Sequence, residues 1–146
     1  MSDFRRVSDS FWASPQITPD DVAEAASQGF TMIVNNRPDG ESDDQTPGDT
    51  IAALAAEHGL GYVAIPVDQS GYRADQLAAM AAALGEAGGK VLAYCRSGTR
   101  STFLWSLTQA QAGAQPAEIA ASAAAAGYDV SPLAPQLFAL AEAAHD

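Results

Sequence analysis

The chain has 146 residues, of which 47% are hydrophobic, and 18 Asp and Glu against seven Lys and Arg give it a formal net charge of -11. This length predicts a single domain, residues 1–146, with enough apolar residues to build its own core. The negative charge opposes binding to nucleic acid or anionic membrane surfaces, and no apolar run has the length of a signal peptide or a membrane span. We therefore expect a cytoplasmic protein with no nucleic-acid or membrane partner.

The first third of the chain predicts one helix, one strand and a long loop. FRRVSDSFWASPQIT, residues 4–18, indicates only a short irregular segment or an edge strand. The next segment has Thr18 as a helix N-cap, Pro19 at the first helical position and Gly29 after the last turn. FTMIVN then predicts a strand, and NNRPDGESDDQTPGD forms a loop that is longer than a connection requires, which favours a functional role.

The middle of the chain alternates between helical and strand patterns. GDTIAALAAEHG predicts a helix capped by Asp49 or Thr50, and GYVAIPV, residues 61–67, predicts a strand. A second amphipathic helix follows over residues 72–89, and KVLAYC, residues 90–95, predicts a third strand. Strands that alternate with helices of this length are typical of βαβ units and a parallel sheet.

Three helical segments follow the last strand. TRSTFLWSLTQAQAG, residues 99–113, has apolar side chains at helical spacing, and two alanine-rich segments follow over residues 115–127 and 131–146. The sequence therefore predicts an α/β fold with a small parallel sheet of about four strands flanked by helices.

The only cysteine lies where this protein concentrates positive charge. Cys95 ends the third predicted strand, and Arg96 and Arg100 follow it in a short turn that leads into a helix. Unpaired N–H groups at a helix N-terminus, together with the helix dipole and the guanidinium groups, favour the thiolate and bind anions. We expect a nucleophilic thiolate in an anion-binding loop. The other loop residues, which supply flexibility and hydrogen-bond donors, are Ser97, Gly98, Thr99 and Ser101.

The residue inventory restricts cofactors and redox chemistry. A single cysteine forms no internal disulfide and has no resolving thiol within the chain. His58 and His145 lie far apart and match no zinc-ligand spacing. We therefore expect neither a metal nor another cofactor.

Three motifs in this order, NNRPDGE, GYVAIPV and AYCRSGTRS, resemble the bacterial beta-lactamase hydrolase-like protein family. The resemblance is to its phosphatase-like domain, which is also named a sulfur transferase domain, and it extends over roughly residues 7–128. It implies the fold of dual-specificity phosphatases and a function as an enzyme. Because the family also occurs fused to a metallo-hydrolase domain of sulfide oxidation, the resemblance implies a separate sulfur dioxygenase-type hydrolase as a partner.

The same resemblance assigns roles to individual residues. Cys95 corresponds to the nucleophile, Arg100 to the phosphate-binding arginine and Ser101 to the hydroxyl that helps the thiolate to leave. Asp68 stands where these phosphatases have a general acid, although a loop aspartate that caps the next helix is an equal alternative. Arg37 and Asp39 are candidates for the surroundings of the site, with surface and turn positions as the alternative.

Loop length distinguishes the function hypotheses. Four residues separate Cys95 from Arg100, whereas the phosphatase signature has five, and the shorter loop resembles that of single-domain rhodaneses. The first hypothesis is therefore transfer of sulfane sulfur from thiosulfate or a persulfide through a Cys95 persulfide. The alternative is hydrolysis of phosphate esters through a phosphocysteine, and the third is a non-catalytic anion-binding module. All three predict a small anionic ligand.

Overall fold

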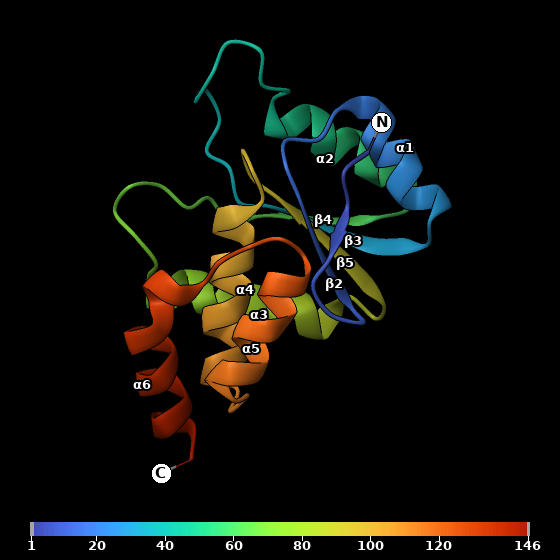
Figure 1. The fold of residues 1–146 in the computed structure, drawn as a ribbon. Helices are drawn as coiled ribbons and strands as arrows, with labels where there is room; N and C mark the ends of the chain where they lie inside the picture. The colour runs from blue at the N-terminus through green and yellow to red at the C-terminus, as the bar shows by residue number, and fades with distance from the viewer. Residues whose placement is uncertain (1, 146) are drawn as a thin grey trace.

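The computed structural model describes residues 2–145 and contains a five-stranded sheet between two layers of helices (Figure 1). The strand order is β1-β2-β5-β3-β4, and only β1 runs antiparallel to its neighbour. The strands are β1 (Arg5–Arg6), β2 (Phe11–Ser14), β3 (Phe30–Asn35), β4 (Gly61–Ala64) and β5 (Lys90–Tyr94). The four parallel strands agree with the expected sheet. The segment predicted as irregular or as an edge strand supplies β1, at the edge of the sheet, and β2.

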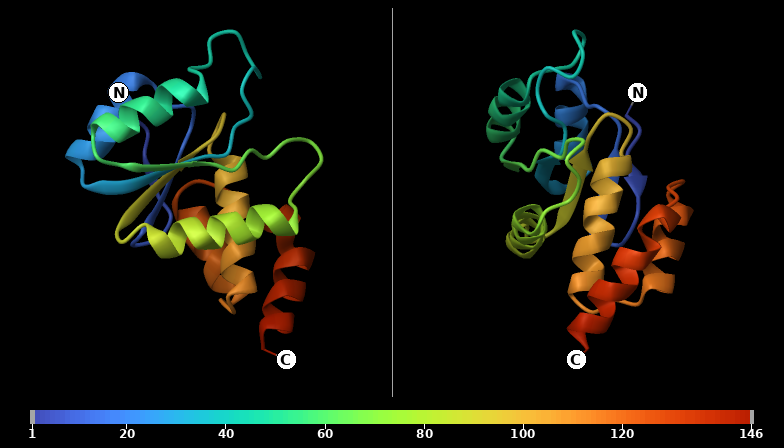
Figure 2. Two further views of the ribbon diagram at one scale, coloured as in Figure 1. Left: turned by 180° about the vertical axis from the view of Figure 1, so that it is seen from behind. Right: turned by 90° about the vertical axis from the view of Figure 1, so that its left-hand side faces the viewer.

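Helices cover both faces of the sheet. They are α1 (Pro19–Ser27), α2 (Gly48–Glu57), α3 (Ala74–Glu86), α4 (Thr99–Gln111), α5 (Pro116–Ala125) and α6 (Ala134–Ala144), with a 3-10 turn η1 (Ser131–Leu133) before the last. α1 and α2 lie on one face, and α3 to α6 lie on the other (Figure 2). None of these helices, within residues 2–145, has the length and apolarity to span a bilayer.

The side chains of the strands pack into two separate hydrophobic cores, one on each face of the sheet. Successive residues of a strand point to opposite faces. In β3, Ile33 accordingly packs in the α1–α2 core and Val34 in the other. The larger core surrounds α4, where Leu104 is buried and Trp105 stacks on Phe11 with a 5.4 Å centroid separation. α4 is therefore fixed by contacts on several sides, which makes its N-terminus a rigid position in the fold.

The N-termini of α1 and α2 are capped in different ways, one by local residues and the other by a residue from the preceding loop. At α1 the predicted cap is confirmed, because Thr18 Oγ1 accepts the Asp21 N–H and the Asp21 carboxylate accepts the Thr18 N–H. At α2 the prediction of Asp49 or Thr50 as the cap is wrong. The helix begins at Gly48, whose N–H donates to Asp39 Oδ1 at 2.8 Å. A carboxylate from the long loop thus takes the place of a local cap.

Candidate functional site

Three loops meet beyond the carboxyl ends of β3, β4 and β5, where open α/β sheets bind ligands. They enclose a cleft of about 750 Å³. The long loop after β3 contributes Arg37 and Glu41, the loop after β4 contributes Asp68, and the loop after β5 contributes Arg96 and Arg100. The cleft is therefore built by segments that are far apart in the sequence.

Cys95 lies between the end of β5 and the start of α4, next to Arg96, which lines the cleft. Its Sγ accepts a hydrogen bond from the Gly98 N–H at 3.1 Å, and the residue has no exposed surface. Gly98 precedes α4 at a φ of 95°, in the left-handed region that favours glycine. The sulfur thus faces a backbone donor and the positive end of the α4 dipole.

The other residues of the cysteine loop differ in orientation. Arg96 is exposed and lines the cleft. The Ser97 hydroxyl donates to Thr99 Oγ1 at 3.0 Å and accepts the Thr99 N–H at 3.3 Å, so these two side chains stabilise the turn itself. Ser101 is fully buried in the first turn of α4, and its Oγ has no hydrogen-bond partner among the described residues. Most buried hydroxyls in proteins are hydrogen-bonded, so the Ser101 hydroxyl is an exception.

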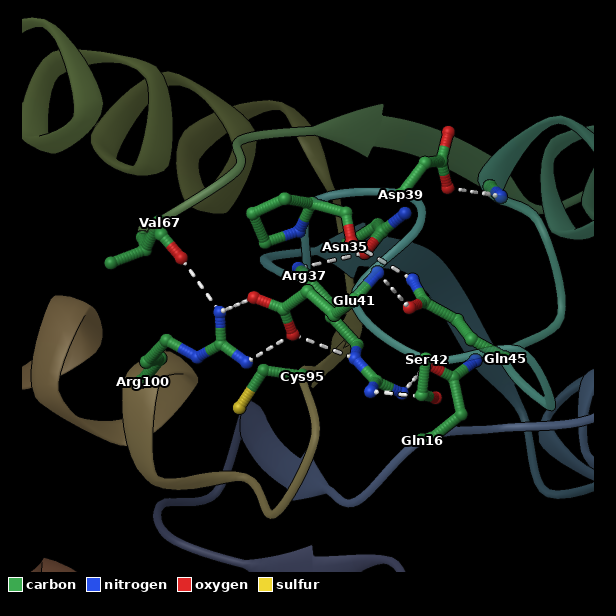
Figure 3. Close-up of polar contacts among 12 residues, drawn as sticks. Gln16, Asn35, Arg37, Asp39, Glu41, Ser42, Gln45, Val67, Cys95 and Arg100 are labelled. Atoms are coloured by element: carbon green, nitrogen blue, oxygen red, sulfur yellow. Dashed lines mark hydrogen bonds and ion pairs between the residues drawn. The ribbon is translucent and has the colours of Figure 1, made fainter. Parts of the chain in front are cut away.

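Arg100 is oriented by a carboxylate that sequence patterns did not single out. Its Nη1 and Nη2 each donate to Glu41 at 2.8 Å, and Nη1 also donates to the Val67 carbonyl at 2.7 Å. Nε has no hydrogen-bond partner among the described residues. The guanidinium lies beside the Glu41 carboxylate and near the Cys95 sulfur (Figure 3), so Nε and the second N–H of Nη2 are left for an anion.

Arg37 is buried. The alternative interpretation, which placed this residue at the surface, is therefore wrong. Only 5% of Arg37 is exposed, and its guanidinium donates to Gln16, Glu41 and Ser42 at 3.0, 2.9 and 3.2 Å. Glu41 Oε1 therefore accepts from both Arg37 and Arg100. The hydrogen bond from Arg100, supported by the one from Arg37, lowers the pKa of Glu41 to about 2. The carboxylate is ionised at neutral pH and joins the two cations.

The two aspartates named from the sequence occupy different places. Asp68 lines the cleft, but its carboxylate accepts hydrogen bonds from the N–H and hydroxyl of Ser70 at 2.8 and 2.5 Å. These bonds lower the pKa of Asp68, so in this conformation it is an acceptor and not a proton donor. It does not cap the following helix, whose N-cap is Arg73. Asp39 points away from the sulfur toward the start of α2 (Figure 3) and serves as the cap described above.

The site offers no set of metal ligands. Within residues 2–145, His, Cys, Asp and Glu form no group of three or more that could hold an ion. What the described residues bring together is a buried thiol, a backbone donor and two arginines joined by a carboxylate. This arrangement matches nucleophilic catalysis on an anion.

The fold is that of the cysteine phosphatases. A family model described as the beta-lactamase hydrolase-like protein, phosphatase-like domain, matches residues 3–112, and the chain belongs to this family. The beta-lactamase hydrolase-like protein of Xylella fastidiosa is 33% identical over 118 residues, which are 80% of this chain and 27% of the relative. The chain thus spans about a quarter of the length of that relative.

Comparison with solved structures also supports a phosphatase-like fold. A protein from Neisseria meningitidis, named as a candidate phosphatase, superimposes with a TM-score of 0.84 at 29% identity, covering 96% of this chain and 99% of its own. TpbA from P. aeruginosa, crystallised in complex with pTyr, has a TM-score of 0.66 at 14% identity and covers 99% of this chain and 91% of its own. The second likeness concerns the fold alone.

Proposed function

We propose that this chain is a cysteine-dependent phosphatase that hydrolyses small phosphate monoesters. The Cys95 thiolate attacks phosphorus, an S–P bond forms, and the ester P–O bond breaks as the alkoxide leaves with a proton. Water then attacks the phosphocysteine and releases inorganic phosphate and the thiolate. Arg100 binds the equatorial phosphate oxygens, and the buried Ser101 hydroxyl stabilises the departing thiolate.

The observation that carries this proposal is the placement of the sulfur. Cys95 Sγ lies 3.1 Å from the Gly98 amide at the N-terminus of α4, with the Arg100 guanidinium beside it. Backbone N–H groups and a planar guanidinium match the oxygens of a phosphoryl group. Because Cys95 has no exposed surface, the side chains above it must move when a substrate enters.

Phosphate ester hydrolysis replaces sulfur transfer as the first hypothesis because of the relatives. The family is described as phosphatase-like, and the Neisseria protein that superimposes best among those compared above carries a phosphatase name. Sulfane-sulfur transfer has no such support. The proton donor for the leaving alkoxide is Asp68 by the family resemblance, and this role requires its carboxylate to leave Ser70 and take up a proton.

Turnover of two aryl phosphates tests the proposal. The wild-type protein should hydrolyse para-nitrophenyl phosphate at least about 10³-fold faster than Cys95→Ser, since the variant lacks the nucleophile. Asp68→Asn should lose little activity with this good leaving group and about 10²-fold with phenyl phosphate, whose leaving group needs a proton. Wild-type turnover no faster than that of Cys95→Ser with either ester would overturn the phosphatase assignment.

Two observations favour sulfane-sulfur transfer as the second candidate. The cysteine loop is one residue shorter than the phosphatase signature, and Asp68, the candidate general acid, accepts hydrogen bonds from Ser70. In this reaction the Cys95 thiolate attacks the outer sulfur of thiosulfate, the S–S bond breaks, sulfite leaves, and cyanide takes the sulfur as thiocyanate. Thiocyanate formation that depends on Cys95, without phosphate release from either aryl ester, would establish it.

The charge distribution supports a small substrate. The chain has a formal net charge of -11, and its cleft is lined by three arginines and two acidic residues, Glu41 and Asp68. The net negative charge repels large polyanions. The same groups of the protein would bind either candidate substrate, a phosphate ester or a thiosulfate-like anion. A separate sulfur dioxygenase-type hydrolase as a partner stays a prediction from the family resemblance.

A further inference from the structure

Tyr128 contacts the cysteine loop from a distant part of the chain. It follows α5 and lies outside residues 3–112, which the family model matches. Its hydroxyl donates to the Ser97 carbonyl oxygen at 3.1 Å across 31 residues of sequence. The residue is only 6% exposed, so this hydrogen bond forms inside the protein.

The Ser97 carbonyl belongs to the same peptide group as the Gly98 N–H. A trans peptide is planar, and its C=O and N–H point in opposite directions. The Tyr128 hydroxyl on the oxygen therefore requires the N–H to point the other way, and there it donates to Cys95 Sγ at 3.1 Å. We propose that Tyr128 is a positioning residue that holds the Ser97–Gly98 peptide with its N–H on the nucleophile.

This peptide needs an external constraint because of its glycine. Gly98 has a φ of 95°, and glycine occupies positive and negative φ with similar ease. Rotation of the peptide by half a turn would place the Ser97 oxygen, a partial negative charge, at the thiolate. A Cβ at position 98 would lie 2.1 Å from the Tyr128 oxygen, so the tyrosine packs directly on the residue that permits rotation.

Tyr128 is itself held in a state suited to this role. The Arg5 guanidinium lies over its ring, 5.4 Å from the centroid, and connects it to β1 at the edge of the sheet. Burial raises the pKa of Tyr128, so the hydroxyl keeps its proton and remains a donor through neutral pH. Arg5, in β1, thus supports the cysteine loop through Tyr128.

Tyr128→Phe tests the inference because it keeps the ring and removes the hydroxyl. Alkylation of Cys95 by iodoacetamide reports on the thiolate directly and needs no substrate. The inference rests on Cys95 as the nucleophile of the proposed function, yet this assay gives an answer whether the substrate is a phosphate ester, thiosulfate or neither. We expect the alkylation rate at pH 7 to fall about tenfold and the midpoint of its pH profile to rise by about one unit.

Tyr62→Phe is the matched control, since it removes a hydroxyl that accepts from Asn35 on the other face of the sheet. It should leave the pH profile of alkylation unchanged. An unchanged profile in folded Tyr128→Phe, even with a lower melting temperature, would show a purely structural tyrosine and overturn the inference.

A measurement on the wild-type protein covers the case in which Tyr128→Phe does not fold. The Gly98 amide should exchange its proton with solvent at least about 100-fold more slowly than an open loop amide, because it is hydrogen-bonded and buried. Exchange at the open-loop rate, measured by NMR, would contradict a fixed peptide.

Discussion

Glu41 joins two arginines, and neutralising it should lower stability in a way that depends on pH. Its carboxylate accepts two hydrogen bonds at 2.8 Å from Arg100 and one at 2.9 Å from Arg37. The substitution Glu41→Gln preserves the size of the side chain and removes its charge. The Arg37 guanidinium, which is 5% exposed, then loses its only anionic partner among the described residues.

The magnitude follows from how deeply the pair is buried. Removing one partner of a fully buried ion pair costs about 3–5 kcal/mol, whereas exposed pairs contribute about 0–1 kcal/mol. The Glu41 and Arg100 side chains are 30% and 23% exposed, and glutamine retains one acceptor oxygen. We therefore expect Glu41→Gln to lower the free energy of unfolding by about 2 kcal/mol at pH 7. This loss corresponds to a fall of about 4–8 °C in the melting temperature.

The pH dependence identifies the charge as the cause. The pKa of Glu41 is lowered from 4.5 to about 2, chiefly by the hydrogen bond from Arg100. A lowered folded-state pKa stabilises the fold above pH 4.5, and this contribution is lost as the pH falls toward 2. Urea unfolding of both proteins between pH 7 and pH 3 should therefore show a difference that shrinks below pH 4.5. A difference under about 0.5 kcal/mol at pH 7, or one that stays constant into acid, refutes this reasoning.

Two further substitutions separate the cysteine loop from the scaffold. Gly98→Ala should lower the free energy of unfolding, measured with urea, by about 2–3 kcal/mol and should slow Cys95 alkylation. The added Cβ would lie 2.1 Å from the Tyr128 oxygen, at a backbone position with a positive φ. A variant as stable as the wild type would contradict this contact. Thr18→Ala removes the α1 cap and should cost about 1 kcal/mol without changing the alkylation rate; altered alkylation would mean that α1 influences the loop.

Local sequence patterns were sufficient for most helices and strands. The sequence predicts Phe30–Asn35 as a strand, and it is β3 residue for residue; Thr18 is predicted as the N-cap of α1 and is confirmed, although its reciprocal partner Asp21 is seen only in the structure. The N-terminal segment is predicted only as irregular structure or an edge strand, because β1 and β2 are too short to show periodicity. β2 becomes a strand by pairing with β5, with Phe11 opposite Val91, and such pairing has no local signature.

Part of the candidate site could be predicted from adjacent residues, and the rest depends on contacts between distant segments. The strand, turn and helix around Cys95 are contiguous, so the thiol and its arginines were identified from adjacent residues. Glu41 was overlooked because it stands in an acidic loop that looks like solvated surface, although its spacing of four residues from Arg37 was a weak signal. Its importance comes from Arg100, which lies 59 residues further along the chain.

The amino-acid sequence by itself determined the alternation of strands and helices and the cysteine loop, since each depends on neighbouring residues. Only the tertiary structure decided that Glu41 joins Arg37 to Arg100 and that Tyr128 reaches Ser97. The Arg100–Glu41 and Tyr128–Ser97 hydrogen bonds join residues that are 59 and 31 positions apart in the sequence. Chain segments that meet only after folding leave no periodicity or spacing from which their meeting can be predicted.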